Sequence, residues 1–130
     1  MSEASVEEVV CRIVAEALDQ PADRVTPASI LMADLGAESL DFLDIVFRLE
    51  QSFDIQITRG EMERAARGTM SEDEFAPGGV IGAAGLERLR QLMPEARDRI
   101  RPGLRPVEIL GLFTVETFAN IVRAKQAAQP

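Results

Sequence analysis

Apolar residues recur at intervals of three and four along several stretches of the chain, the spacing that places them on one face of a helix. No stretch shows the strict alternation that is typical of a half-buried strand. Ser5 and Glu8 form a capping-box pattern ahead of the first helix, and Thr114 is placed to cap the last one. These patterns predict an all-α fold. The predicted helices span residues 6–18, 39–53, 61–67, 85–93 and 115–125.

Proline, glycine and charge mark the segments that we expect between the helices. Pro21 and Pro27 lie in a predicted loop that continues to Ala37. A second predicted loop, residues 69–85, is acidic at first and then rich in glycine and proline. The tail at residues 126–130 is expected to be frayed.

The composition excludes several classes of site. The chain has no histidine, which removes Ser–His and Cys–His nucleophilic pairs and histidine metal sites. The single cysteine, Cys11, permits neither an internal disulfide nor a metal site made of cysteines, and we predict it to be partly exposed without a chemical role. A net charge of −8 and the absence of Trp and Tyr disfavour nucleic acid as a partner. No catalytic residue and no metal site is therefore predicted.

Length and hydrophobicity favour a folded protein with no membrane span. The chain has 130 residues, of which 46% are hydrophobic, and this is enough to bury a core without disulfides or metals. Residues 1–5 lack the basic run and apolar segment of a signal peptide. The longest stretch without a charged residue, 75–86, is too short to cross a membrane and is broken by proline and glycine. We expect a cytoplasmic monomer.

Charge is divided unevenly along the chain. Residues 1–58 carry a net charge of −9 and residues 59–130 a net charge of +1, while the arginine-rich stretch 88–105 carries +4. One interpretation is that the two parts attract each other or form separate solvated faces. The other is that the acidic part offers a surface to basic partners.

The predicted helix 39–53 carries two apolar stripes, and a helix that is buried on one side needs only one. The first stripe is assigned to the core and comprises Phe42, Ile45, Val46, Leu49 and Phe53. The second lies more than a quarter-turn away, beside Asp44, and comprises Leu40, Leu43 and Phe47. Either the segment 59–105 packs over this second stripe, or the stripe is a docking surface for a partner.

Ser39 is the strongest candidate for chemistry. It follows Gly36, which can adopt a positive φ at little steric cost, and it begins the predicted helix. The free N–H groups and the dipole of a helix N-terminus would favour a phosphate attached to this serine. Serine is also a common N-cap residue, so the local pattern leaves a purely structural role open.

Residues 34–57, DLGAESLDFLDIVFRLEQSFDIQI, resemble the signature of acyl carrier proteins. Residues 25–29 resemble the loop before that signature, and residues 113–118 resemble the start of the last helix of the family. The resemblance covers residues 5–57 and 113–125. It implies a small helical bundle with an apolar interior able to shelter an acyl chain, and a covalent 4′-phosphopantetheine arm on the signature serine.

Transferred residue by residue, the resemblance assigns the arm to Ser39 and the turn before it to Asp34, Leu35 and Gly36. It assigns contact with a phosphopantetheinyl transferase and with acyl-handling enzymes to Leu40, Asp41, Leu43, Asp44 and Phe47. It assigns the acyl-chain interior to Ile45, Val46, Leu49, Phe53 and Ile57, although each is equally well explained as ordinary core. The transferase would supply the metal and the base for attachment, so the chain itself need not be an enzyme.

The chain also departs from the family. Glu38 stands where aspartate is common, and Arg48, Gln51 and Ser52 dilute the usual acidity of this helix. Above all, 56 residues lie between Ile57 and Thr114, where the family has a short loop and a brief helix. We interpret the chain as one carrier domain, 1–130, with a core of 5–58 and 113–125 and an insertion at 59–112.

The insertion contains enough apolar residues to predict that it is folded, partly as helix, and packed on the bundle. One hypothesis is that it enlarges or covers the acyl cavity, which indicates a specialised fatty-acyl or lipid pathway. The competing hypothesis is that its arginines form a docking face for a particular partner. Its apolar residues include Phe75, Val80, Ile81, Leu86, Leu89, Leu92, Ile100, Leu104, Ile109 and Leu110.

Two alternatives to a fatty-acyl carrier remain open. One is an aryl, peptidyl or polyketide carrier; aryl and peptidyl carriers usually have a second glycine before the serine, where this chain has Ala37 and Glu38. A helical interaction module that kept the fold and lost the arm is disfavoured by the intact Ser39, followed by Leu40 and Asp41.

Overall fold

A computed structural model describes residues 5–58 and 61–128, and the regular structure of these residues is helical. Their one β-type pairing is an isolated antiparallel bridge between Ile30 and Thr114. The predicted all-α class is therefore confirmed. Contacts divide the chain into two compact units, which we call the first unit (residues 1–57 and 113–130) and the inserted unit (residues 58–112).

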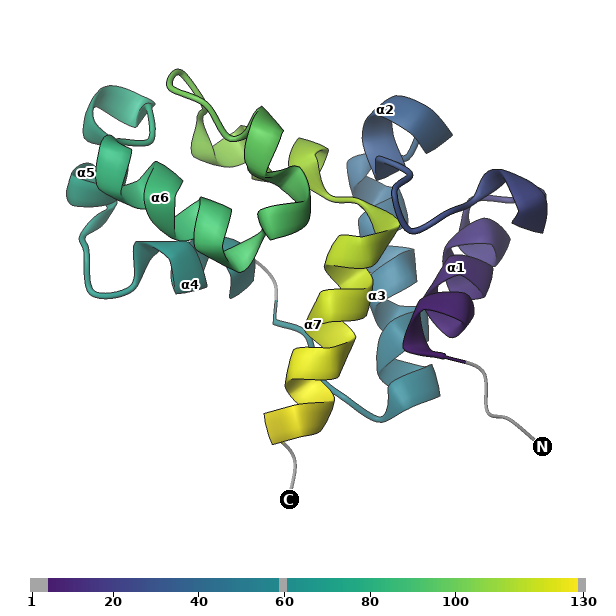
Figure 1. Cartoon of the computed structure of the whole chain (residues 1–130). Coiled ribbons are helices and arrows are strands. Elements are labelled where there is room, and N and C mark those ends of the chain that lie inside the picture. Colours follow the sequence, from purple (N-terminus) through teal and green to yellow (C-terminus); the bar gives the residue numbers. More distant parts are fainter. Residues whose placement is uncertain (1–4, 59–60, 129–130) are drawn as a thin grey trace. The chain divides into compact units, whose positions relative to one another are not determined.

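The first unit is built from three long helices: α1 (Val6–Ala17), α3 (Ser39–Phe53) and α7 (Val115–Ala128). α1 packs against both α3 and α7, and Figure 1 shows the three helices side by side. Each helix turns one apolar face inward, as its periodicity predicts. The fully buried aliphatic residues of this core are Val10, Val14, Leu31, Ile45, Leu49, Val115, Ala119 and Val122.

The predicted caps of the first and last helices are confirmed. The Ser5 hydroxyl accepts a hydrogen bond from the Glu8 N–H at 3.1 Å, and the Thr114 hydroxyl accepts one from the Thr117 N–H at 3.1 Å. α7 continues to Ala128, so the frayed tail predicted from residue 126 is wrong for residues 126–128, while 129–130 lie outside the described residues. The physical reason is that this end is rich in Ala, Lys and Gln, which are good helix formers.

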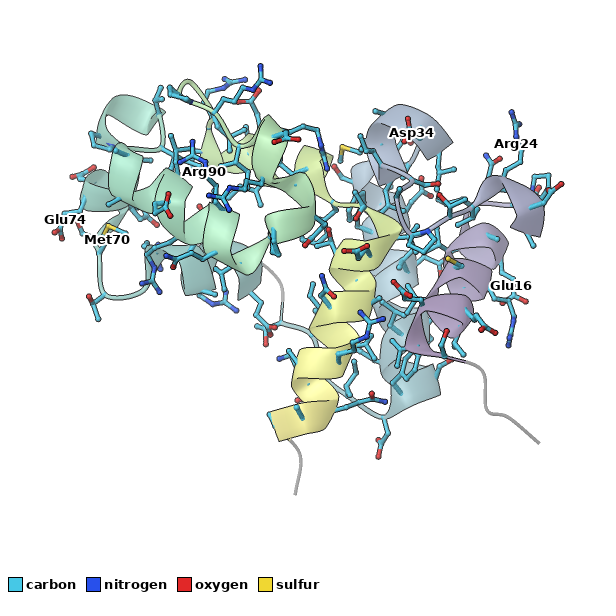
Figure 2. All side chains as sticks on the ribbon, in the orientation of Figure 1. Glu16, Arg24, Asp34, Met70, Glu74 and Arg90 are labelled. Atoms are coloured by element: carbon cyan, nitrogen blue, oxygen red, sulfur yellow. The ribbon has the colours of Figure 1, made fainter. Side chains whose placement is uncertain are left out.

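The segment 21–37, predicted to be a loop, contains two short helices. A 3₁₀ turn, η1 (Ala22–Arg24), follows Pro21, and a five-residue helix, α2 (Leu31–Leu35), precedes Gly36. The Asp34 carboxylate of α2, labelled in Figure 2, accepts a hydrogen bond from the Ile30 N–H at 2.8 Å. This bond satisfies a donor at the helix start that a capping side chain would otherwise serve. No capping pattern in the sequence reveals this helix.

The inserted unit consists of short helices. Two of them match predicted helices: α4 (Glu61–Arg67) and α6 (Ala83–Leu92), and α6 packs against α4 and against the 3₁₀ helix η3 (Pro94–Arg99). A further 3₁₀ helix, η4 (Pro106–Leu112), completes the unit. The unit has its own buried apolar residues, as its composition predicts: Ala66, Phe75, Ile81, Leu86, Leu89, Met93, Ala96, Ile100, Ile109 and Leu112.

The second predicted loop, residues 69–85, is also partly helical, with α5 (Glu72–Phe75) and the 3₁₀ turn η2 (Pro77–Gly79). Ser71 and Glu74 form a capping box, in which each side chain accepts a hydrogen bond from the backbone N–H of the other. The backbone bond and then the hydroxyl of Ser71 lower the pKa of Glu74. The acidic run that suggested a solvated loop is thus the first turn of a helix.

Gly85 shows how closely the inserted unit is packed. A Cβ atom at this position would lie 2.8 Å from ring atoms of Phe75 and 2.8 Å from the Ile81 side chain. The lack of a side chain therefore lets α6 approach the end of α5.

Three arginines of the inserted unit connect segments of its own backbone. Arg88 donates to the carbonyls of Ala65 and Ala66 at the end of α4, and Arg90, labelled in Figure 2, donates to the Ile100 carbonyl at 2.9 Å. Arg99 donates to the Leu112 carbonyl at 2.8 Å. These three cations connect chain segments within the unit. Three of the six arginines in the stretch 88–105 thus have a structural role inside the unit.

Candidate functional site

A tight turn between α2 and α3 presents Ser39. Gly36 ends α2 in the left-handed conformation, with φ of 71°, as its position predicts. The Ala37 N–H then donates to the Leu31 carbonyl at 2.9 Å, so the chain folds back on α2 before α3 begins. A side chain at residue 36 would meet no atom within 4 Å, so the left-handed φ is the property that favours glycine there.

Ser39 is the first residue of α3, and Glu38 is the N-cap. The Asp41 carboxylate accepts a hydrogen bond from the Glu38 N–H at 2.7 Å, so a carboxylate, not the serine hydroxyl, serves this end of the helix. Ser39 is exposed, and no described residue hydrogen-bonds to its hydroxyl. The structural role that the sequence left open, an N-cap serine, is therefore wrong, and the hydroxyl is available for reaction.

The start of α3 suits a phosphate ester on Ser39. The first N–H groups of a helix have no partner in the preceding turn, and the helix dipole places a partial positive charge there. α3 is 15 residues long, so its dipole is fully developed. The exposed hydroxyl, the positive end of the helix dipole and the turn at Gly36 together fit a covalent phosphopantetheine arm.

The other residues predicted for this turn have structural surroundings. Asp34 is exposed but bonded to the Ile30 N–H, and Leu35 is half-buried at the end of α2. Both lie in α2, the helix that precedes the Gly36 turn.

The second apolar stripe of α3 faces solvent. The exposed fractions of Leu40, Leu43 and Phe47 are 75%, 50% and 60%. Beside them, the Asp44 carboxylate accepts a hydrogen bond from Arg48 at 3.0 Å, one turn further along the helix. Leu40, Leu43 and Phe47 thus form an exposed apolar stripe with acids on its flank.

The residues predicted to line the interior divide into two groups. Ile45 and Leu49 are fully buried, whereas Val46, Phe53 and Ile57 are half-buried. The Ile57 N–H donates to the Glu50 carboxylate at 3.0 Å, which folds the chain back on the end of α3.

A contact among three phenylalanines was not predicted. Phe42, Phe113 and Phe118 meet in the first unit, with ring centroids 5.4 to 6.0 Å apart and edge-type or tilted geometry. Such pairs contribute about 0.5–1.5 kcal/mol each beyond the burial of their area. The periodicity placed Phe42 and Phe118 in the core, but no pattern in the sequence shows that side chains 71 and 76 positions apart touch.

Other features lie apart from this site. A pocket of about 440 Å³ is lined by Cys11 and by residues of α1 and η1, and it includes none of the predicted site residues. Within residues 5–58 and 61–128, no group of three or more His, Cys, Asp or Glu side chains is arranged to hold a metal ion. In the same described part of the chain, no helix is both long and apolar enough to span a bilayer.

Comparison with known proteins identifies the class of this site. The family described as "Phosphopantetheine attachment site" matches residues 8–66, a range that includes Ser39. The chain thus contains a phosphopantetheine attachment domain. It is also 39% identical over 64 residues to an acyl carrier protein of Akkermansia muciniphila, and the match covers 49% of this chain and 80% of that protein. The chain belongs to the acyl carrier protein family, and its cofactor is 4′-phosphopantetheine.

Proposed function

We propose that Ser39 carries the 4′-phosphopantetheine arm, and that the thiol of the arm holds acyl groups as thioesters. The observation that supports this most directly is the state of the Ser39 hydroxyl. It is exposed at the first position of α3, beyond the left-handed Gly36 turn, and no described residue bonds to it.

In the attachment step, the Ser39 hydroxyl oxygen attacks the phosphorus of coenzyme A that carries the pantetheine. The new bond joins Ser39 Oγ to that phosphorus, the pyrophosphate bond breaks, and adenosine 3′,5′-bisphosphate leaves. The hydroxyl proton passes to a base of the transferase. The chain has no histidine, and its part is to present the hydroxyl at a helix start that favours the phosphodiester. In this proposal the protein is a carrier and not an enzyme.

The surface of α3 is proposed to meet the transferase and the acyl-handling enzymes. Leu40, Leu43 and Phe47 offer exposed apolar contact, and Asp41 and Asp44 lie among them. The first unit carries the whole net charge of −8, because the inserted unit has nine acids and nine bases. An acidic carrier attracts basic partner surfaces and speeds their encounter at low salt.

The acyl group is proposed to belong to a specialised fatty-acyl or lipid pathway. The support for this is the inserted unit. It is a compact unit that this chain has in addition to the region similar to an acyl carrier protein. The candidates to contact an acyl chain are the four interior residues of α3, Ile45, Val46, Leu49 and Phe53, together with Ile57 beyond its end. Because Ile45 and Leu49 are fully buried, a chain reaches them only when the packed core opens.

Intact-mass measurement tests the attachment. The protein is incubated with coenzyme A and a broad-specificity phosphopantetheinyl transferase, beside Ser39→Ala and Ser52→Ala variants. Ser52 is an exposed serine near the other end of the same helix, so its variant is the matched control. The parent and Ser52→Ala should each gain one phosphopantetheinyl group, and Ser39→Ala none. No gain in the parent with several transferases would favour an unmodified interaction module.

A further inference from the structure

One flank of the exposed surface of α3 carries both signs of charge. Asp41, Asp44 and Arg48 follow one another at intervals of three and four residues, which places them on the same side of the helix. The side chains of Asp44 and Arg48 are 45% and 42% exposed. They lie beside the exposed apolar stripe of Leu43 and Phe47, so a partner that covers this stripe also meets the charged flank.

Both acids of this flank already have partners within the helix. The Arg48 Nε donates to Asp44 Oδ1 at 3.0 Å, in an ion pair between residues four apart. The Asp41 carboxylate accepts a hydrogen bond from the Glu38 N–H at 2.7 Å. The partner of Asp44 is a full positive charge, so Arg48 neutralises the carboxylate beside the stripe.

The charge of α3 changes along its length. The acids Glu38 and Asp41 stand at its start, whereas Arg48 and Gln51 occupy the second half of the exposed surface. Glu50 is on the opposite flank, where its carboxylate accepts a hydrogen bond from the backbone beyond the helix end. A partner that lies along α3 thus meets negative charge near its start and a cation further along.

Arg48 is an exception in an acidic part of the molecule. The first unit contains 13 acidic and five basic residues, and Arg48 is the one basic residue of α3. The other four bases belong to α1, η1 and α7. A basic partner that is attracted by the acidic unit therefore meets a like charge on this helix at one position only.

We propose that Arg48 is a specificity-determining residue of the α3 surface. The proposal rests on the proposed function, since it concerns the enzymes that dock on α3. Arg48 withdraws the charge of Asp44 from the surface and adds a cation that repels a basic partner. The partner that fits has basic groups opposite the start of α3 and a neutral or acidic group opposite Arg48. A partner that is basic along its whole docking surface fits poorly.

The effect comes from the charge of Arg48 and not from the strength of its ion pair. Exposed pairs of residues four apart on a helix contribute little, so a partner can break the bond to Asp44 at small cost. Arg48 then remains at the interface as an unpaired cation. Its removal should therefore favour a basic partner while the helix stays formed.

The rate of arm attachment measures this effect. A broad-specificity phosphopantetheinyl transferase loads the protein from coenzyme A at low salt, and intact mass against time gives kcat/KM for the carrier. Arg48→Gln should raise kcat/KM by about threefold, the factor for one pair of charges about 6 Å apart in water. Arg48→Glu, which changes the charge by two, should raise it by about tenfold. The parent and both variants should have equal kcat/KM in about 1 M salt, where the Debye length is about 3 Å.

Two controls separate the position of the charge from its amount. Arg24→Gln removes the same charge from η1, where Arg24 is exposed (Figure 2), and should leave kcat/KM close to that of the parent. Asp44→Asn should lower kcat/KM by about threefold at low salt, because Arg48 loses its counter-charge. The double variant Asp44→Asn/Arg48→Gln has the net charge of the parent and should return to a kcat/KM near that of the parent. Circular dichroism checks that each variant is folded.

The outcomes separate the two claims. No mass gain in the parent would overturn the proposed function and this inference with it. A parent that is loaded, with Arg48→Gln no faster at low salt, would overturn the inference alone. An equal gain in Arg24→Gln would also overturn it, since net charge and not the place of Arg48 would then set the rate. A gain in Arg48→Gln that persists in 1 M salt would show that the arginine acts by its shape and not by its charge, which contradicts the inference.

Discussion

Ser39 and Cys11 are both nucleophilic side chains, and their surroundings give them different reactivity. The Ser39 hydroxyl is exposed at a helix start, where a phosphate is favoured. The Cys11 thiol is half-buried on α1, where burial and then the charge of Glu7 raise its pKa above the ordinary value of 9.0. A raised pKa keeps the thiol protonated at neutral pH, and a protonated thiol is a poor nucleophile.

Cys11 should therefore react slowly with alkylating reagents. In the Ser39→Ala variant, which has no arm and so no second thiol, iodoacetamide should modify Cys11 more slowly at pH 8 than it modifies a small thiol of ordinary pKa. The rate should rise with pH to a midpoint above that of the small thiol, because only the thiolate reacts. Intact mass against time gives the rate at each pH.

Two further samples test the cause of this slow reaction. The same variant unfolded in urea should react at the rate of an ordinary thiol. Glu7→Gln, added to the Ser39→Ala variant, should react faster than folded Ser39→Ala alone, because the charge of Glu7 that helps to raise the pKa of Cys11 is gone. Folded protein that reacts as fast as the small thiol would contradict the raised pKa.

At the scale of the elements, the starts of α3 and α7 are capped by different residues, and the start of α3 presents Ser39. α3 begins with Glu38 and Asp41 in place of a capping serine, and this leaves Ser39 free. Thr114 directly precedes α7 and caps it with a buried hydroxyl. Thr114 also pairs with Ile30, just before α2. A substitution at this cap should lower the free energy of unfolding more than a substitution at an exposed threonine.

Thr114→Val should lower the free energy of unfolding by about 1–2 kcal/mol, because the shape is kept while the Thr117 N–H loses a buried acceptor. Thr69→Val is the control, since Thr69 is exposed and should change stability by less than about 0.5 kcal/mol. Urea denaturation followed by circular dichroism measures both variants. Equal stability of Thr114→Val and the parent would show that the cap contributes little.

At the scale of the whole molecule, the inserted unit joins two points of the first unit that lie at opposite ends of α3. Ile57 is hydrogen-bonded to Glu50 near the end of that helix, whereas Phe113 packs against Phe42 in its first turn. A helix of 15 residues is about 22 Å long, so a replacement for the inserted unit has to span roughly that distance. A flexible linker of about 15 residues has a root-mean-square length of about 21 Å.

Replacement of residues 58–112 by such a Gly/Ser linker should leave a folded first unit that still takes up one phosphopantetheinyl group. The reason is that the buried residues of the three long helices belong to the first unit itself. Circular dichroism and intact mass after transferase treatment check the two parts of this prediction. A shortened protein that is unfolded would show that the inserted unit is needed to complete the core of the first unit.

The sequence by itself determined the helices that have strong periodicity and a recognisable end. Residues 39–53 were predicted with the observed bounds, and the starts of α1 and α7 follow from their capping patterns. The fold class and the position of Ser39 at a helix start also follow from local pattern, because each depends on residues within a few turns of one another. The family follows from the resemblance of residues 34–57 to a known signature. The weaker signals at α2 and α5 were missed, since a helix of four or five residues has too few turns to show a period.

The tertiary structure decided what depends on contacts between distant residues. Only the folded chain shows that the Ser39 hydroxyl is free, because the cap comes from Glu38 and Asp41. Only the folded chain brings Phe42 to Phe113 and Phe118, since spacing along a sequence carries no information on which helices meet. It also turns three arginines of a basic stretch into donors for nearby backbone carbonyls, because a guanidinium in the fold binds whatever acceptor the packing places within its reach.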